Sequence, residues 1–201
     1  MTQRTPGPRV VFLGKTGAGK TSLINSLFDL DFTTGRSEAV TMDLQYANVA
    51  VAGRRFEIVD TPGFAESRET EEKYRELYRS LLPTADHLVW AVQSHPRVFR
   101  PDQEALIALA VGLLERVRTT VALTRADSIG PGDWDRLAGC PSSGQLLSLN
   151  EQTENVLGKL SPYLPSLTRE DIVPCSPTTG YGLDALIDRI ASALPVASAK
   201  D

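Results

Sequence analysis

The stretch GKTGAGKT, residues Gly14 to Thr21, decides the fold, because it matches the spacing G-x-x-x-x-G-K-[ST] of a phosphate-binding loop. Its glycines let the backbone turn tightly and approach an anion without a Cβ in the way. Successive N–H groups then point at the phosphate oxygens, and the following helix adds its positive N-terminal end. We expect Lys20 to reach the β- and γ-phosphates and the Thr21 hydroxyl to ligate Mg²⁺. The residues expected to bind the ligand here are Lys15, Thr16, Gly17, Ala18, Gly19, Lys20, Thr21 and Ser22.

The sequence on either side of this loop predicts the strand–loop–helix context that the motif requires. The apolar run VVFL (residues 10–13) precedes it, as expected of a buried parallel strand. After it, SLINSLF (residues 22–28) places its apolar residues on one stripe of an amphipathic helix. A glycine-rich turn that binds nothing is the alternative, but such a turn does not need the Gly-Lys-Thr ending.

Composition excludes several classes of protein. The chain has 201 residues, which suits one α/β domain, and its net charge of −4 gives no support for nucleic-acid binding. Two cysteines, Cys140 and Cys175, can build neither a disulfide framework nor a zinc site, so we expect a cytoplasmic protein. No apolar run is long enough for a transmembrane helix. We expect a flexible lead-in at residues 1–7, a single domain at 8–195 and a frayed tail at 196–201.

Strand and helix patterns alternate along the whole chain. Strands are predicted at residues 9–14, 43–52, 54–60, 87–92, 119–124 and 171–176. Helices are predicted at residues 19–29, 65–82, 101–117, within 144–161, and at 182–194. The alternation predicts a three-layer α/β fold with a mostly parallel sheet and helices on both faces. The strands at 43–52 and 54–60 are separated by Gly53 and predict an antiparallel pair at one edge of the sheet.

Two further motifs follow predicted strands. Asp60 ends one strand and precedes Thr61-Pro62-Gly63. Ligands in open α/β sheets bind outside the carboxyl ends of strands, so Asp60 is placed to hold Mg²⁺ and Gly63 to offer its N–H to a γ-phosphate. The alternative is a simple turn after a strand.

The second motif is Thr124-Arg125-Ala126-Asp127, which follows the strand at 119–124. A carboxylate at Asp127 can accept hydrogen bonds from N1–H and the exocyclic amine of guanine, a donor pair that adenine lacks at that edge. The alternative is an aspartate that caps a turn.

With GKTGAGKT, DTPG, TRAD and then PCSPTTGYGLDAL in this order, the chain resembles the Era-like branch of the TrmE–Era–EngA–septin group of P-loop GTPases. The resemblance covers residues 8–194 and implies a GTPase that uses GTP, GDP and Mg²⁺. It implies Lys20, Thr41 and Gly63 as catalytic residues and Thr21, Thr41 and Asp60 as metal ligands. It also implies that Thr124, Arg125, Asp127, Cys175 and Ser176 lie around the base.

The chain departs from the family pattern at several positions. Arg125 replaces the usual lysine, and its stem and planar guanidinium can still pack on a base. Pro177 lacks the N–H that the family directs at guanine, so the amide of Ser176 or of Thr178 would replace it. Phe64 stands where Ras-type enzymes carry the glutamine that orients the attacking water. Gly17 replaces the asparagine with which some relatives hold K⁺, so activation by that route is unsupported.

Three functions are compatible with these residues. The favoured one is a GTP-controlled molecular switch with slow hydrolysis, in which loops 31–42 and 61–82 contact a second copy or a protein effector. A second is a dimerising scaffold with little turnover, of the septin-like or immunity-associated type, which Phe64 favours. A third is an ATP-using enzyme, against which Asp127 argues. His87, His95 and Cys175 are interpreted as structural residues.

Overall fold

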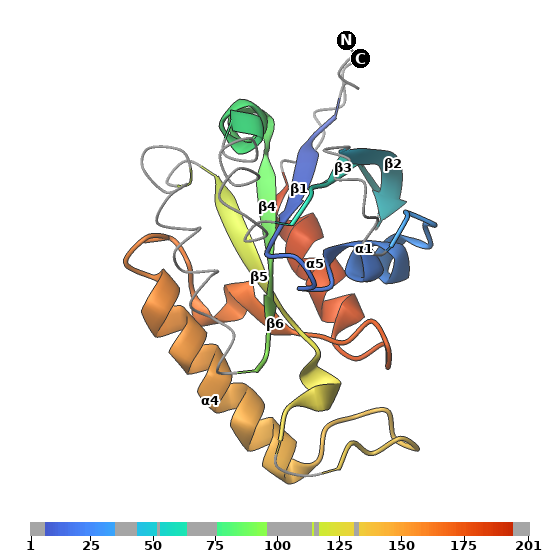
Figure 1. Cartoon of the computed structure of the whole chain (residues 1–201), viewed down its shortest axis with the longest axis vertical. Helices are drawn as coiled ribbons and strands as arrows, with labels where there is room; N and C mark the ends of the chain where they lie inside the picture. Colours follow the sequence, from blue (N-terminus) through green and yellow to red (C-terminus); the bar gives the residue numbers. More distant parts are fainter. Residues whose placement is uncertain are drawn as a thin grey trace.

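A six-stranded sheet in the order β2-β3-β1-β4-β5-β6 forms the centre of the molecule (Figure 1). The computed structural model describes residues 7–34, 44–51, 53–63, 76–95, 114, 117–130 and 133–194. The strands are β1 (Arg9–Leu13), β2 (Gln45–Val51), β3 (Arg54–Asp60), β4 (His87–Gln93), β5 (Arg118–Thr124) and β6 (Ile172–Pro174). Only β2 pairs antiparallel with its neighbour, β3, and the other pairs are parallel. The predicted fold class is therefore confirmed.

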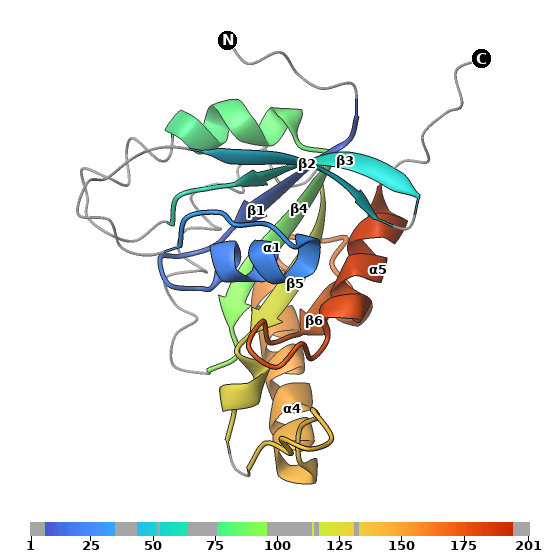
Figure 2. The same ribbon diagram turned by 90° about the vertical axis from the view of Figure 1, so that its right-hand side faces the viewer.

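Helices cover both faces of this sheet. They are α1 (Lys20–Phe28), α4 (Ser143–Leu160) and α5 (Leu183–Ala193), with short 3₁₀ turns η1 (Leu82–Thr84), η3 (Ala126–Ser128) and η4 (Arg169–Asp171). Helices α1 and α5 lie on one side of the sheet and α4 on the other (Figure 1, Figure 2). Among the described ranges, no helix is both long and apolar enough to cross a bilayer.

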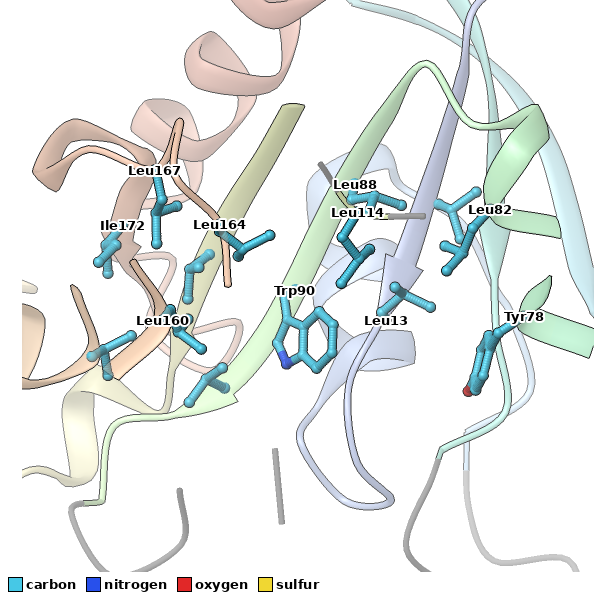
Figure 3. Close-up of a cluster of buried hydrophobic side chains, with 14 of the residues drawn as sticks. Leu13, Tyr78, Leu82, Leu88, Trp90, Leu114, Leu160, Leu164, Leu167 and Ile172 are labelled. Atoms are coloured by element: carbon cyan, nitrogen blue, oxygen red, sulfur yellow. The ribbon is translucent and has the colours of Figure 1, made fainter. Parts of the chain in front are cut away.

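Two hydrophobic clusters hold the layers together, and β1 contributes to both. Val10 and Phe12 pack with residues of α1 and α5, whereas Val11 and Leu13 point to the opposite face. Figure 3 shows the second cluster, which extends from Tyr78 and Leu82 past Trp90 to Leu167 and Ile172. Burying each large apolar side chain contributes about 1.5–3 kcal/mol, so both faces of the sheet are strongly stabilised.

The predicted elements agree with the described residues, with one notable difference. The last strand is only Ile172–Pro174, shorter than the predicted 171–176. Residue 171 belongs to the 3₁₀ turn at 169–171, and the Ser176 N–H turns away to the Tyr181 carbonyl oxygen. The helix predicted at 65–82 is present at 76–81 and continues into η1. The rest of that helix, most of the helix at 101–117 and loop residues 35–42 lie outside the described residues.

Strand register brings the motif-bearing loops together. Phe12 is opposite Asp60, and Gln93 is opposite Thr124, so β1, β3, β4 and β5 end at the same edge of the sheet. Ligands of open α/β sheets bind at this carboxyl edge. Asp60 and Thr124 lie at this edge, and the loop with Lys20 follows β1 there.

Candidate functional site

The loop between β1 and α1 is built to receive an anion. Gly14 has φ 150°, and a Cβ on it would lie 2.5 Å from the Ala91 carbonyl oxygen, so only glycine fits. Gly19 is the N-cap of α1 with φ 89°, and no side chain caps the helix. The first-turn N–H groups of α1 therefore have no capping side chain, which leaves them for an anionic ligand.

Lys20 is folded back over this loop. It is 6% exposed, and its Nζ donates a hydrogen bond to the Gly14 carbonyl oxygen at 3.2 Å. This places a positive charge inside the turn of the loop, where an anion would be held by both the backbone dipoles and the ammonium group.

Thr21 and Asp60 meet beside Lys20. The Thr21 hydroxyl donates to Asp60 Oδ2 at 2.6 Å, while the buried Oδ1 has no hydrogen-bond partner within the described residues. Burial raises the pKa of Asp60 above its ordinary value, although the hydrogen bond from Thr21 and the charge of Lys20 act to lower it.

This pair fits a hard divalent cation. A buried carboxylate oxygen without a partner lies next to a hydroxyl oxygen, and Mg²⁺ is usually held by one or two such protein ligands together with water and substrate phosphates. In the described part of the chain, no cluster of three or more His, Cys, Asp or Glu side chains offers another metal site. Thr41, the third predicted ligand, lies outside the described residues.

The segment after β3 is held in place from two sides. The Thr61 hydroxyl donates to the Phe12 carbonyl oxygen at 2.7 Å, and the Tyr78 hydroxyl donates to the Pro62 carbonyl oxygen at 2.5 Å. Tyr78 is 2% exposed and packs in the hydrophobic cluster on one face of the sheet. Gly63, which follows Pro62, lies directly against Thr16 of the phosphate loop.

The TRAD segment is tied to the phosphate loop through the carbonyl oxygen of Gly17. That oxygen accepts hydrogen bonds from Arg125 Nη2 at 3.1 Å and from Gln93 Nε2 at 2.7 Å. Thr124 adds a third tie, because its hydroxyl donates to the Ala18 carbonyl oxygen at 2.8 Å. Arg125 has the left-handed φ of 58°, and the Ser94 hydroxyl donates to its carbonyl oxygen at 2.9 Å. The two loops therefore form one connected unit.

Asp127 lies on η3 at the rim of a pocket of about 390 Å³. The pocket is lined by Asp127, Ser128, Ile129, Gly130, Asp133, Trp134, Arg136 and Gln145. Gln145, 2% exposed, donates its Nε2 to the carbonyl oxygens of Asp127 at 3.3 Å and Ile129 at 3.0 Å. The same side chain accepts from the Ser142 N–H at 3.1 Å and completes a capping box at the start of α4.

The loop after β6 borders the same region. The Ser176 N–H donates to the Tyr181 carbonyl oxygen at 2.9 Å, so this amide is already used within the loop. The ring of Tyr181 packs edge-on against Trp134, with centroids 5.3 Å apart.

Two of the three residues interpreted as structural, Cys175 and His87, behave accordingly. Cys175 is fully buried, and burial raises the pKa of its thiol to about 12, so it is not a reactive nucleophile. His87, at the opposite end of β4 from the site, bonds the Thr120 hydroxyl at 3.0 Å. Burial lowers the pKa of His87 to about 4.

Two polar residues of this region were missed from the sequence. Gln93 directly follows the predicted strand 87–92 at the edge where ligands bind, and that position was a usable signal. Gln145 stands three residues after Ser142 in the capping-box spacing S-x-x-Q, but nothing in that spacing predicts its reach to Asp127.

The fold and the site together define a P-loop nucleotide-binding protein. The glycine-rich loop at residues 14–21, the Thr21–Asp60 pair and the TRAD segment meet at one edge of a mostly parallel sheet. Residues 9–124 match the model of the family described as 50S ribosome-binding GTPase, and the chain belongs to this family.

The chain is also similar to curated proteins along most of its length. The chain is 28% identical to the uncharacterised protein YfjP of Escherichia coli (strain K12), over 94% of this chain and 62% of that protein. It is 28% identical to a probable GTP-binding protein EngB of Anaeromyxobacter dehalogenans, over 92% and 82%. The chain thus spans about three-fifths of the length of YfjP.

Solved structures agree on the fold. Aquifex aeolicus Era bound to GDP·AlF₄⁻ superposes with a TM-score of 0.69 at 21% identity, covering 94% of this chain and 57% of Era. Era in complex with MgGDPNP and a fragment of 16S ribosomal RNA gives a TM-score of 0.70 at 20% identity, covering 96% and 59%. The predicted resemblance to Era-like GTPases is confirmed.

Proposed function

We propose that this chain binds GTP and GDP with Mg²⁺, hydrolyses GTP slowly and acts as a nucleotide-controlled molecular switch. The observation that carries the proposal is the shared carbonyl oxygen of Gly17, which Arg125 and Gln93 hold at 3.1 Å and 2.7 Å. It joins the phosphate loop to the loop that carries Asp127.

The phosphates would lie on the backbone of residues 15–22, with Lys20 against the β- and γ-phosphates. Thr21 and Asp60 would hold Mg²⁺, because their oxygens are adjacent and one Asp60 oxygen has no hydrogen-bond partner among the described residues. The bound cation supplies charge neutralisation between the β- and γ-phosphates. Thr41 is the third ligand that we propose.

Guanine would be recognised at the other end of the site. The Asp127 carboxylate would accept from N1–H and the exocyclic amine, and the Arg125 side chain would cover one face of the base. Since the Ser176 amide already donates to Tyr181, we assign the contact that Pro177 cannot make to the Thr178 amide. Cys175 and Ser176 are fully buried and would support this end of the site through their backbone.

For hydrolysis, water attacks the γ-phosphorus in line and yields GDP and phosphate. Lys20 and the Gly63 N–H would stabilise the charge on the transferred group. Phe64 has no polar group to orient the water, which is the reason to expect a slow rate. Loops 31–42 and 61–82 would contact an effector or a second copy.

The proposal is tested by competition binding with a fluorescent GDP analogue. GDP and GTP should displace the analogue, whereas ADP and ATP should not. Removal of Mg²⁺ should lower the affinity for GTP more than the affinity for GDP. Equal displacement by ADP would refute the guanine assignment.

A dimerising scaffold is the second candidate, and Phe64 is the residue that favours it. Phosphate release per molecule should then stay near zero at every protein concentration, although the chain binds GTP tightly. Slow but measurable release from GTP would favour the switch.

The family description names the 50S ribosome, but a net charge of −4 gives no electrostatic support for binding RNA. We therefore leave ribosome binding out of the proposal. A cytoplasmic location is part of it, because Cys140 and Cys175 are both unpaired thiols.

A further inference from the structure

Gly63 packs against Thr16 with no room for a side chain between them. A Cβ on Gly63 would lie 2.4 Å from both the backbone nitrogen and Oγ1 of Thr16, and 2.5 Å from its Cα. Real Cβ atoms essentially never approach other heavy atoms so closely. The backbone of Gly63 therefore rests on Thr16, and the Thr16 hydroxyl faces this glycine.

Both sides of this contact are fixed in position. On one side, the Gly17 carbonyl oxygen next to Thr16 is held by Gln93 and Arg125. On the other, the residues before Gly63 are held by hydrogen bonds from the Thr61 and Tyr78 hydroxyls. The Thr16 hydroxyl is thus a pre-positioned polar group at the boundary between the phosphate loop and the segment after β3.

That boundary is where the γ-phosphate of the proposed substrate belongs. Lys20 occupies the inner side of the loop, and Gly63 is the residue whose N–H is expected to meet the γ-phosphate. Gly63 has to move away to admit this group, while Thr16 stays in place through the bonds to the Gly17 carbonyl oxygen. The Thr16 hydroxyl then faces the phosphate and the water that attacks it.

We propose that Thr16 is a catalytic residue that orients the attacking water in place of the glutamine that Phe64 replaces. This inference rests on the proposed function, since it concerns hydrolysis of a bound nucleoside triphosphate. Thr16 Oγ1 accepts a hydrogen bond from the water, and its own proton bonds a γ-phosphate oxygen.

In this step the water oxygen bonds to the γ-phosphorus while the bond from phosphorus to the β–γ bridging oxygen breaks. The electron pair of the broken bond leaves with GDP, and the water proton ends on the released phosphate. Thr16 is chemically unchanged.

The test compares Thr16→Ala and Thr16→Ser with the wild type under single-turnover conditions. We expect Thr16→Ala to slow hydrolysis roughly 10- to 100-fold and Thr16→Ser to stay within about three-fold, because serine keeps the hydroxyl. The matched control is Thr84→Ala, which lies on η1 before β4, at the edge of the sheet opposite the site. It should hydrolyse GTP like the wild type.

Binding provides a readout that is separate from turnover. Affinity for GDP should be unchanged in both Thr16 variants, because GDP has no γ-phosphate. Affinity for GDP with aluminium fluoride, which mimics the transferred group, should fall in Thr16→Ala in parallel with the rate.

Three results would overturn the inference. The first is hydrolysis of GTP by Thr16→Ala at the wild-type rate or faster. The second is a loss of activity in Thr16→Ser as large as in Thr16→Ala. The third is a loss of GDP affinity in Thr16→Ala as large as its loss of rate. The first two would show that Thr16 only packs against Gly63, and the third that the loop is distorted. A wild type that binds no guanine nucleotide would instead refute the proposed function itself, and the inference with it.

Discussion

Replacing Gln145 by leucine should separate guanine recognition from fold stability. Leucine keeps the size of the side chain but removes its donors and acceptor, so the Ile129 carbonyl oxygen and the Ser142 N–H lose bonds of 3.0 Å and 3.1 Å. The Asp127 carbonyl oxygen loses a longer bond of 3.3 Å. A buried polar group left unpaired costs about 1–3 kcal/mol, and the two shorter bonds dominate, so we expect a loss of about 3 kcal/mol in the free energy of unfolding.

The same change releases the loop that carries Asp127. We expect affinity for GDP to fall roughly tenfold beyond any effect of stability, which corresponds to about 1.4 kcal/mol. Affinity for IDP, which lacks the exocyclic amine, should fall less, because the Asp127 carboxylate makes fewer bonds to it. The discrimination between GDP and IDP should therefore narrow.

Ser142→Ala is the matched control. It removes the side-chain half of the capping box, a bond of 3.3 Å from the Gln145 N–H, and leaves the contacts from Gln145 to Asp127 and Ile129 in place. We expect a loss of about 1 kcal/mol in stability and no change in nucleotide preference. Urea unfolding measures the stability, and competition against a fluorescent GDP analogue measures the affinities. If the ratio of the affinities for GDP and IDP is the same in Gln145→Leu as in Ser142→Ala, Gln145 does not position Asp127.

Three further predictions follow from single residues. His87 has a pKa lowered from 6.5 to about 4, so its stabilising effect is complete above pH 6.5 and is lost as the pH falls towards 4. Between pH 6.5 and 4, the free energy of unfolding of the wild type should therefore fall by about 3 kcal/mol relative to that of His87→Gln, as measured by urea unfolding. Parallel pH profiles of the two proteins' unfolding free energies would contradict this. Asp127→Asn should shift competition binding from guanine towards xanthine nucleotides, whereas an unchanged preference would place the base elsewhere. GDP should change the tryptophan fluorescence of the wild type but not of Trp134→Phe, because Trp134 packs on Tyr181 at the base end and the other tryptophan, Trp90, is fully buried. A response that persists in the variant would mean that Trp134 does not sense the base.

The parts of the site that were predictable are contiguous in sequence. The GKTGAGKT, DTPG and TRAD segments each follow a buried strand, and parallel strands end at the same edge of a sheet. Their local residue order therefore predicted both the fold class and the place where Lys20, Asp60 and Asp127 lie.

The parts that were not predictable depend on tertiary contacts. Gln93 and Gln145 reach the site through side chains that cross from β4 and α4 to other loops. The use of the Ser176 amide by Tyr181 depends on how the loop closes after β6. The contact of Gly63 with Thr16 joins residues from two strand ends, and no spacing in the sequence predicts how close they come.

Release of phosphate from GTP, with ATP as the control and across a wide range of protein concentration, tests the central claim most directly. The account predicts slow, Mg²⁺-dependent release from GTP and none above background from ATP. Equal release from GTP and ATP would contradict it. So would the absence of release from GTP at every protein concentration, if the folded protein still binds GDP.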